Sequence, residues 1–547
     1  MSYPQRPVER GPIPRVPRST LQRYRGAILD PDAAAQSHRS LQPTAFVHDQ
    51  ILVQGSGDGS ALDALLEAAQ ATGHDIGTSQ SAERKRDDYV QQLAGGALEL
   101  MTKRWVTRFR IAPKSTSSTS VADAYSTIRK YRELAGQDQT LKVGLNHLVT
   151  LAGVGLQGAP YFEGPSLGGA PYFEGPGLGG APYFEGPGLG GAPYFEGPST
   201  GVPYFEGPGI GTPVGGRIPV TWLGRPPVPE RSKHTGRRPV VAVLDTGLGR
   251  HGWLREADAH LGATVNGQPI GVGDDVPDPE ITGIVQQPGL GLLDRDSGHG
   301  TFIAGIIRQT CPDAKVLALR VMPSDGVVEE HQLVIALNKL LVRQAQAQAD
   351  RSLDDIIDVL SLSLGYYHED PDDVRYSSVL AGTLRSFAAL GVAVVAAAGN
   401  DHTTTPFFPA GFASREEGAD QRSDRVPLVS VGALNPNGSR AVFSNSGEWV
   451  SCYRPGANVV STLPTTFDGS SQPDLVTPSG GESVDRDDFT GGFGVWSGTS
   501  FAAPVLAGEI AASLAEQGNL DDVERTSMVD RGWVALAQTI EWKRPSS

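Results

Sequence analysis

The sequence predicts an α/β fold with a doubly wound, mostly parallel sheet for residues 237–547. Short apolar runs such as 240–244 have the length of buried strands. They alternate along the chain with longer stretches whose apolar residues recur at helical spacing. Strands that are separated by helices join through crossover connections, so they pair in parallel and carry helices on both faces of the sheet.

The expected elements follow one another from residue 239 onward. Strands are expected at 240–244, 315–321, 357–363 and 392–396, and helices at 299–307, 330–349 and 374–390, with a further helix starting near 501. Ligands of such sheets lie beyond the carboxyl ends of the strands. Asp245 and Asn400 both stand at such an end, so we expect them at the edge where a ligand binds.

The chain before residue 237 divides into three segments. Residues 1–43 are rich in Pro, Arg and Gln with little periodicity, and we expect a mobile N-terminal arm there. Residues 44–152 alternate between strand and helix patterns, which predicts a small α+β domain. Its strands are expected at 50–54, 105–112 and 141–149, and its helices at 60–72 and 120–135. Residues 153–236 form a Gly/Pro-rich linker.

A tandem repeat dominates this linker. The unit PYFEGP recurs five times, at Tyr161, Tyr172, Tyr183, Tyr194 and Tyr204. Two prolines in each unit exclude a continuous helix and a central strand. One interpretation is a flexible tether. The other is a set of recognition or cleavage sites, because an extended segment can add as a strand to a protease cleft and five copies raise the local concentration for a partner.

Composition excludes several classes of function. The formal net charge of −15 argues against general nucleic-acid binding, which requires a basic face. No run of about 18 apolar residues occurs, and the N-terminus lacks the apolar core of a signal peptide. We therefore expect no membrane segment, and a protein that is cytoplasmic or exported without a recognisable signal peptide. Two cysteines, Cys311 and Cys452, do not make a disulfide framework.

Three short motifs supply a carboxylate, an imidazole and a hydroxyl in that order. Asp245 lies in VLDTG, His299 in GHGT and Ser500 in GTSFAAP. These are the three groups of a catalytic triad, in which the imidazole takes the hydroxyl proton and the carboxylate orients the imidazole. Unrelated folds run this triad in different orders, and Asp…His…Ser is the order of subtilisin.

With these flanking sequences the chain resembles the subtilisin-like serine proteases, the subtilases of peptidase family S8. The serine motif departs from the family only at Phe501, where Met is usual, and the histidine motif has Phe302 where His is common. The resemblance implies a serine endopeptidase that forms an acyl-enzyme on Ser500. His299 is then the general base and acid, and Asp245 orients it.

Further positions match the family's binding groups. Asn400 closes the run VAAAGN and, by the resemblance, donates its amide into the oxyanion hole. The run Ser363, Leu364, Gly365 resembles the strand that pairs with substrate, and Ala397, Ala398, Gly399 the second wall of the primary specificity pocket. Because these residues are small, we expect an open pocket that accepts apolar or aromatic side chains.

Residues 44–152 resemble the inhibitory propeptide that precedes many subtilase domains. The run 144–149, GLNHLV, is similar to its last strand, where an Asn-His pair is common. The resemblance implies that the protein is made as a precursor, a zymogen. An unrelated α+β accessory domain is the alternative.

The sequence specifies no cofactor with certainty. Subtilases often bind calcium, but the acidic stretches at 416–420 and 485–488 lack ligand spacing, and we expect solvated loops there. The expected partners are protein or peptide substrates, with the protein's own N-terminal domain or repeats as further candidates.

A competing hypothesis is a scaffold protein whose repeats bind a partner and whose catalytic domain is degenerate. The intact set of catalytic motifs argues against this hypothesis. In a third hypothesis the protease cuts its own repeats and releases them as peptides.

Overall fold

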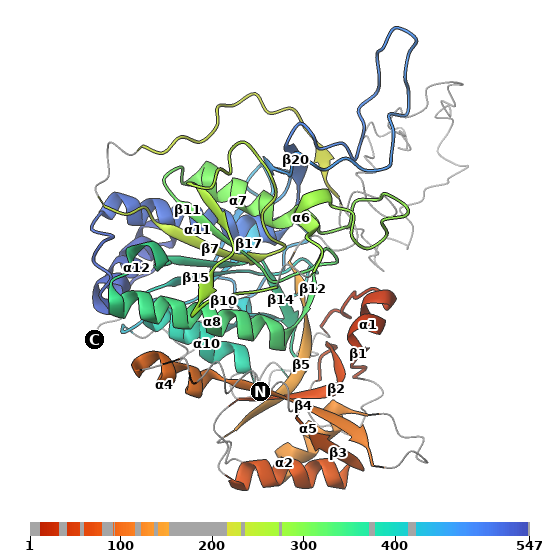
Figure 1. Cartoon of the computed structure of the whole chain (residues 1–547), viewed down its shortest axis with the longest axis vertical. Coiled ribbons are helices and arrows are strands. Elements are labelled where there is room, and N and C mark those ends of the chain that lie inside the picture. Colours follow the sequence, from red (N-terminus) through yellow and green to blue (C-terminus); the bar gives the residue numbers. More distant parts are fainter. Residues whose placement is uncertain are drawn as a thin grey trace, which may run out of the picture.

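The computed structural model describes most of the chain (Figure 1). The described residues are 11–31, 41–54, 59–78, 91, 93, 95–114, 122–135, 141–152, 216–230, 236–272, 276–370, 378–413 and 423–544. The PYFEGP repeats and the acidic stretch 416–420 lie outside them. None of the helices in this described part combines the length and apolar character that crossing a membrane requires.

A seven-stranded sheet forms the centre of the C-terminal part, in the order β18-β17-β15-β13-β7-β11-β8. Every neighbouring pair in it is parallel. Its central strands are β7 (Val240–Asp245), β13 (Val359–Leu362), β15 (Ala393–Ala397) and β11 (Lys315–Arg320), and the outer ones are β17 (Val429–Leu434), β18 (Cys452–Pro455) and β8 (Ala259–Leu261). The predicted parallel sheet is therefore confirmed.

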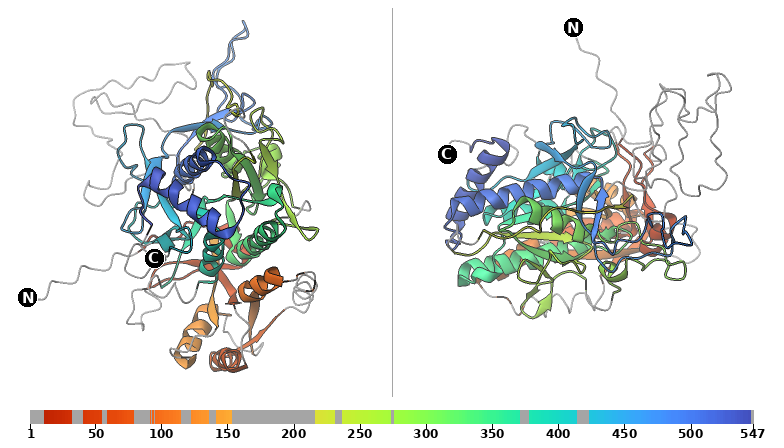
Figure 2. Two further views of the ribbon diagram at one scale, coloured as in Figure 1. Left: turned by 90° about the vertical axis from the view of Figure 1, so that its left-hand side faces the viewer. Right: turned by 90° about the horizontal axis from the view of Figure 1, so that it is seen from above.

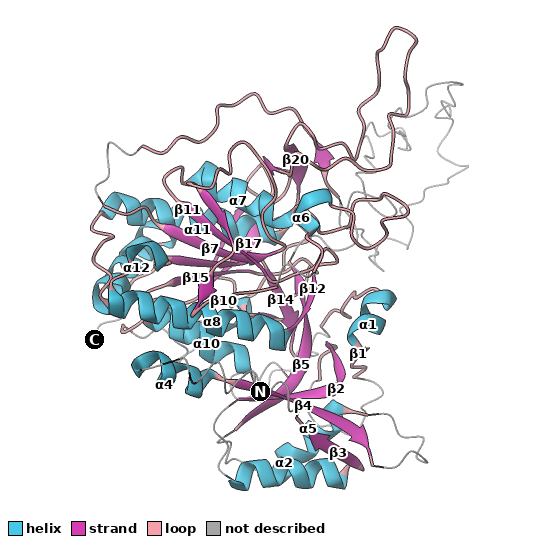
Figure 3. Cartoon of the chain, viewed as in Figure 1, coloured by secondary structure: helices cyan, strands magenta, loops and turns pink. Residues whose placement is uncertain are grey.

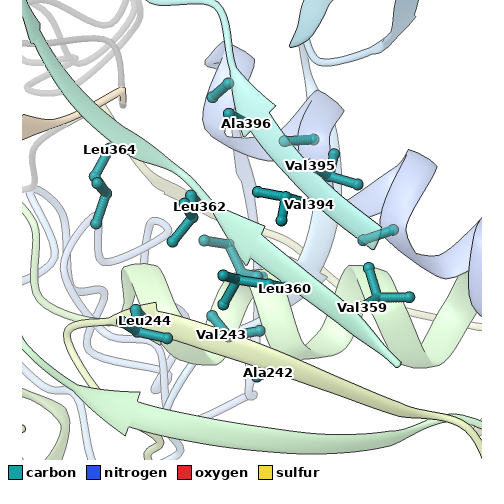
Figure 4. Close-up of a cluster of buried hydrophobic side chains, with 14 of the residues drawn as sticks. Ala242, Val243, Leu244, Val359, Leu360, Leu362, Leu364, Val394, Val395 and Ala396 are labelled. Atoms are coloured by element: carbon teal, nitrogen blue, oxygen red, sulfur yellow. The ribbon is translucent and has the colours of Figure 1, made fainter. Parts of the chain in front are cut away.

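Side chains on the central strands interlock across the sheet. Leu360 of β13 lies opposite Ala242 of β7 on one side and Val394 of β15 on the other, as Figure 4 shows. All three are fully buried. Strands buried on both faces read as continuous apolar runs, which is why the sequence pattern located them within a few residues.

Helices cover both faces of this sheet. On one face α7 (His299–Thr310) contacts α11 (Thr499–Gln517), which also contacts α12 (Arg525–Ile540). On the other face α8 (Glu330–Asp350) contacts α10 (Val379–Ala389), and Figure 2 shows the two helical layers from further directions. Shorter elements complete this part: β6 (Ile218–Pro219), β9 (Thr264–Val265), β10 (Gln268–Pro269), α6 (Pro279–Thr282), β12 (Val327–Glu329), β14 (Leu364–Tyr367), β16 (Phe407–Phe408), β19 (Val459–Thr462) and β20 (Phe493–Trp496).

The N-terminal residues form antiparallel strands with helices packed against them. Strand β2 (Ala45–Gln54) lies between β4 (Val106–Pro113) and β5 (Lys142–Leu151), and β4 also pairs with β3 (His74–Gly77). Helices α2 (Gly59–Ala71) and α5 (Ala124–Ala135) contact each other. Helix α4 (Gly95–Arg104), which the sequence did not predict, packs instead against α8 and α10. The division of the chain into domains stays a prediction.

Strand β5 connects this antiparallel sheet to the C-terminal part. It pairs antiparallel with β12 and with β14, so strands from both parts form one eight-stranded sheet. Figure 3 shows β5 running from the N-terminal strands up to the end of the parallel sheet. The last residues of β5 therefore reach the edge at which Asp245 and Asn400 were expected.

The expectation of a mobile arm over residues 1–43 is wrong for part of that range. Residues Arg18–Tyr24 form helix α1, and Gly26–Ile28 form strand β1, which pairs with β2. Contacts with the C-terminal part hold α1: Thr20 Oγ1 donates to Asp325 Oδ2 at 3.0 Å, and the Tyr24 hydroxyl donates to the Val327 carbonyl at 2.8 Å. These partners lie some 300 residues further along the sequence, so no local sequence pattern predicts the helix.

Candidate active site

Asp245 and His299 come from two adjacent elements and meet in the interior. Asp245 is the last residue of β7, and His299 is the first residue of α7, directly after Gly298 in the left-handed conformation (φ 83°). His299 Nδ1 donates to Asp245 Oδ1 at 2.7 Å, and the Thr246 amide donates to the same oxygen at 2.8 Å. Both side chains are buried.

The charges around His299 favour its protonated form. Burial lowers the pKa of this imidazole, but the negative charge of Asp245 and the hydrogen bond to it raise that pKa, with smaller contributions from Asp296 and Glu280. The net effect is a raised pKa. An imidazole in this setting is a good acceptor for a proton that comes from a nucleophile.

Ser500 is the second residue of α11, on the side of the sheet where His299 lies. The ring of the next residue, Phe501, lies 5.3 Å from the His299 ring. The Ser500 hydroxyl donates to the Ser363 carbonyl at 3.3 Å, while His299 Nε2 has no hydrogen-bond partner in the described part of the chain. The structure therefore brings the three predicted groups together without a hydrogen bond between Ser500 and His299.

The carbonyl group of Ala152, the residue after β5, points at two donors. It accepts from the Ser500 amide at 3.1 Å and from the Asn400 side-chain amide. Asn400 Oδ1 in turn accepts from the Thr499 amide at 2.9 Å, which orients the Asn400 side chain. Two such donors aimed at one oxygen form the geometry of an oxyanion hole.

The predicted substrate strand is paired with the chain's own β5. Leu364 lies opposite Leu151, Gly365 lies opposite Thr150, and the Ala152 amide donates to the Ser363 carbonyl at 2.8 Å. Residues 150–152 thus add to β14 as an antiparallel strand, the mode in which protease clefts bind extended peptides.

The second predicted wall, residues 397–399, lies beside Asn400 at the end of β15. The Gly399 amide donates to Thr499 Oγ1 at 3.0 Å, and Asn445 Nδ2 donates to the Ala398 carbonyl at 2.9 Å. The ring of Phe407, a residue that the sequence did not single out, packs against both walls.

Glu280 is a second functional candidate that the sequence pattern missed. Its buried carboxylate accepts from Thr301 Oγ1 at 2.6 Å and from the Gly298 amide at 3.1 Å, and it also contacts the Thr246 hydroxyl. Burial raises the pKa of Glu280 to about 7. The sequence offers no signal that Glu280 lies beside the predicted catalytic residues, because Asp278-Pro279-Glu280 is typical of the start of a short helix.

The described residues contain one cluster whose ligand atoms lie close enough to hold a metal, formed by His147, His368 and Glu369. Its groups already bind one another: His147 Nε2 lies 2.9 Å from Glu369 Oε2, and His147 Nδ1 lies 2.6 Å from Glu330 Oε2. Calcium prefers oxygen ligands, so two imidazoles do not fit it. The acidic stretch 485–488 does not bring three side-chain ligands together within the described chain.

Comparisons with known proteins identify the family of the C-terminal part. The family described as "Subtilase family" matches residues 236–540, more than half of the chain. An intracellular serine protease of Paenibacillus polymyxa is 29% identical over 291 residues, which cover 50% of this chain and 66% of that protein. Subtilisin BL of Lederbergia lenta is 28% identical over 299 residues, 52% of this chain and 78% of that protein.

Other similarities cover less of the relative. A thermophilic serine proteinase of Bacillus sp. (strain AK1) is 28% identical over 273 residues, 46% of this chain and 53% of that protein. The chain thus spans less than two thirds of this relative and of the Paenibacillus protein. Fervidolysin from Fervidobacterium pennivorans, a keratinolytic enzyme related to subtilisin, superposes with a TM-score of 0.43 and 16% identity over 87% of this chain and 55% of that one. By the match over residues 236–540, this chain belongs to the subtilase family.

Proposed function

We propose that the protein is a serine endopeptidase with Ser500 as nucleophile, His299 as general base and acid, Asp245 as the orienting carboxylate and Asn400 in the oxyanion hole. The observation that supports this most is the Ala152 carbonyl, which accepts from the Ser500 amide and the Asn400 side chain. A peptide carbonyl in that position has its carbon beside the proposed nucleophile.

The proposed reaction proceeds by acyl transfer. The Ser500 side chain first turns from the Ser363 carbonyl towards His299 Nε2, which takes the hydroxyl proton as Oγ attacks the carbonyl carbon. Asn400 and the Ser500 amide donate to the oxygen that becomes negative. The C–N bond then breaks, His299 gives its proton to the leaving amine, and water hydrolyses the ester on Ser500 by the reverse sequence.

We further propose that the protein is made as a precursor that cuts itself after Ala152. Strand β5 occupies the substrate strand through its pairing with β14, and the Ala152 amide and carbonyl make the contacts expected of the residue before a cleaved bond. The segment up to Ala152 would then act as an inhibitor that has the form of a product. The bond that follows Ala152 is the one expected to break.

Ser500→Ala tests both proposals. Wild-type protein should react with a fluorophosphonate probe and yield a new N-terminus at residue 153, whereas Ser500→Ala should do neither and should stay intact. Ser513→Ala, a buried serine further along the same helix, is the matched control and should behave as wild type. Labelling of the Ser500→Ala protein would exclude Ser500 as nucleophile; a labelled wild-type protein that is cut elsewhere would exclude only the self-cleavage after Ala152.

A further inference from the structure

Two short segments flank the space that receives the side chain preceding the cleaved bond, residues 363–365 and 397–399. Under the proposed function this side chain is that of Ala152, whose amide donates to Ser363. Each segment ends in a glycine, Gly365 on one wall and Gly399 on the other. The inference below rests on that proposed function, because it takes Ala152 as the residue before the cleaved bond.

One aromatic ring lies against both glycines. A Cβ atom added to Gly365 would lie 2.5 Å from Phe407 Cε1 and 2.9 Å from Cδ1, and one added to Gly399 would lie 3.1 Å from Cδ1 and Cγ. Ordinary van der Waals contact begins at 3.4 Å. The edge of the Phe407 ring therefore lies beside both walls, on the side where each glycine would otherwise carry a side chain.

The position of this ring is determined by its neighbours. Phe407 is 3% exposed, and its backbone in β16 pairs with Tyr367 of β14. The Tyr367 ring packs on it with centroids 5.1 Å apart. The Tyr367 hydroxyl donates to Asp401 Oδ2 at 2.7 Å and accepts from Asn445 Nδ2 at 2.8 Å.

Asn445 also connects this support to the pocket wall. Its Nδ2 donates to the Ala398 carbonyl at 2.9 Å, and it lies 2.5 Å from the place of a Cβ on Gly399. The ring, the tyrosine behind it and the second wall are thus one packed unit. A large substrate side chain would have to displace a buried ring from this unit, and close-packed interiors resist such insertion.

We propose that Phe407 closes the primary specificity pocket, so that the protein cleaves after small residues such as alanine and rejects leucine and phenylalanine at that position. This replaces the expectation of an open pocket for apolar or aromatic side chains. The chain's own Ala152 satisfies the restriction. A hydrophobic pocket changes kcat/KM by about 10–200-fold between substrates that differ by one methylene group. The phenyl ring of a substrate phenylalanine is much larger than a methylene, so the preference for alanine over phenylalanine should reach at least the upper end of that range.

The test uses peptides that copy the chain's own β5. Anilides of Val-Thr-Leu-Ala, Val-Thr-Leu-Leu and Val-Thr-Leu-Phe follow residues 149–152 and differ only in the last residue. Wild-type protein, expressed as the full chain, assayed after any self-cleavage is complete and with active sites counted by fluorophosphonate, should favour the alanine peptide over the phenylalanine peptide about 100-fold or more in kcat/KM.

Phe407→Ala should open the pocket. Cleavage of the phenylalanine peptide should rise at least tenfold relative to cleavage of the alanine peptide. Phe412→Ala is the matched control, because Phe412 packs on Phe408 with ring centroids 4.9 Å apart, and no Phe412 atom is among the nearest neighbours of Gly365 or Gly399. It should leave the ratio unchanged. Phe407→Leu, a milder change, should shift the ratio in the same direction if Phe407→Ala fails to fold.

Two results would overturn the proposal. A wild-type protein that is labelled by the probe but cleaves the phenylalanine peptide as fast as the alanine peptide has an open pocket. A ratio that neither Phe407 variant changes would mean that another residue sets the preference. Absence of labelling and of all cleavage would instead overturn the proposed function, and the pocket inference with it.

Discussion

Glu280 is a buried carboxyl group beside the proposed catalytic pair. Burial raises its pKa from 4.5 to about 7, although the hydroxyl groups of Thr246 and Thr301 partly stabilise the charged form. In the unfolded chain this group ionises near 4.5. The folded protein should therefore lose stability as the pH rises from 4.5 to 7, by about 3 kcal/mol from this group alone.

Glu280→Gln should remove that loss, because an amide keeps an acceptor for Thr301 and never ionises. We expect urea unfolding in the Ser500→Ala background to give similar free energies for both proteins at pH 5, and a more stable Gln variant at pH 8. Glu516→Gln, at an exposed glutamate of α11 for which the described contacts include no ion pair, serves as control. If the free energy of unfolding changed with pH equally in the Gln variant and in its parent, the buried Glu280 carboxyl group would not be the source of the pH dependence.

The motif residues could be singled out from the sequence, whereas the packing residues could not. Asp245, His299, Ser500 and Asn400 each stand in a recognisable string at the end of a strand or the start of a helix. Phe407 stands in no such string. Its proposed role depends on Gly365 of β14 and on Gly399, two residues after the end of β15, both lying beside it, a relation that only the folded chain creates.

At the scale of single elements, β5 carries a charged residue into the interior of the molecule. His147 lies between two carboxylates, with Nδ1 at 2.6 Å from Glu330 and Nε2 at 2.9 Å from Glu369. His368 and Arg132 also face Glu369. Burial lowers the pKa of His147, but the two carboxylates outweigh it and raise that pKa to about 9.

This pair of contacts should make the docking of β5 depend on pH. Because the folded pKa lies above the unfolded value of about 6.5, the stabilisation is complete below pH 6.5 and disappears as the pH rises through 9. It amounts to about 3 kcal/mol. In the Ser500→Ala background, His147→Gln should lower the melting temperature clearly at pH 6 and much less at pH 10.

His48→Gln on the neighbouring strand β2 is the control for this experiment, since His48 makes no ion pair with either glutamate among the described contacts. It should shift the melting temperature equally at both pH values. A His147→Gln protein that melts lower by the same amount at pH 6 and pH 10 would show that His147 contributes packing and no charge.

Two helices that the sequence did not predict, α1 and α4, share one cause. Helices α1 and α4 begin without a strong local signal, and their partners come from distant parts of the chain. Asn338 of α8 donates to the Arg104 carbonyl at the end of α4 at 2.9 Å, and Tyr24 of α1 donates to Val327. Tertiary contacts of this kind override weak propensity. The four central strands β7, β11, β13 and β15 and the long helix α8 were, by contrast, predicted within a few residues, whereas helix α12 and strand β17 were not predicted.

At the scale of the whole molecule, a deletion tests what residues 158–213 add to the proposed protease. If these residues are only a tether, a protein that lacks them should have a kcat/KM for the alanine peptide within about twofold of the wild-type value. It should also still be cleaved after Ala152, because none of the proposed site residues lies in the deleted segment. Peptide assays and N-terminal sequencing of the deletion protein measure both. Loss of peptidase activity would show that the repeats belong to the working enzyme.

Under the proposed self-cleavage, the shared eight-stranded sheet separates two events: the breaking of the bond after Ala152 and the dissociation of β5 from the C-terminal part. Breaking the bond after Ala152 removes one covalent link, but β5 stays joined to β12 and β14 by backbone hydrogen bonds and by His147. Under the proposed self-cleavage, the duration of latency is therefore set by the dissociation rate of this ten-residue strand and not by the speed of the chemistry. A freshly cut molecule would stay inactive until β5 leaves, so conditions that weaken the strand pairing would shorten that period.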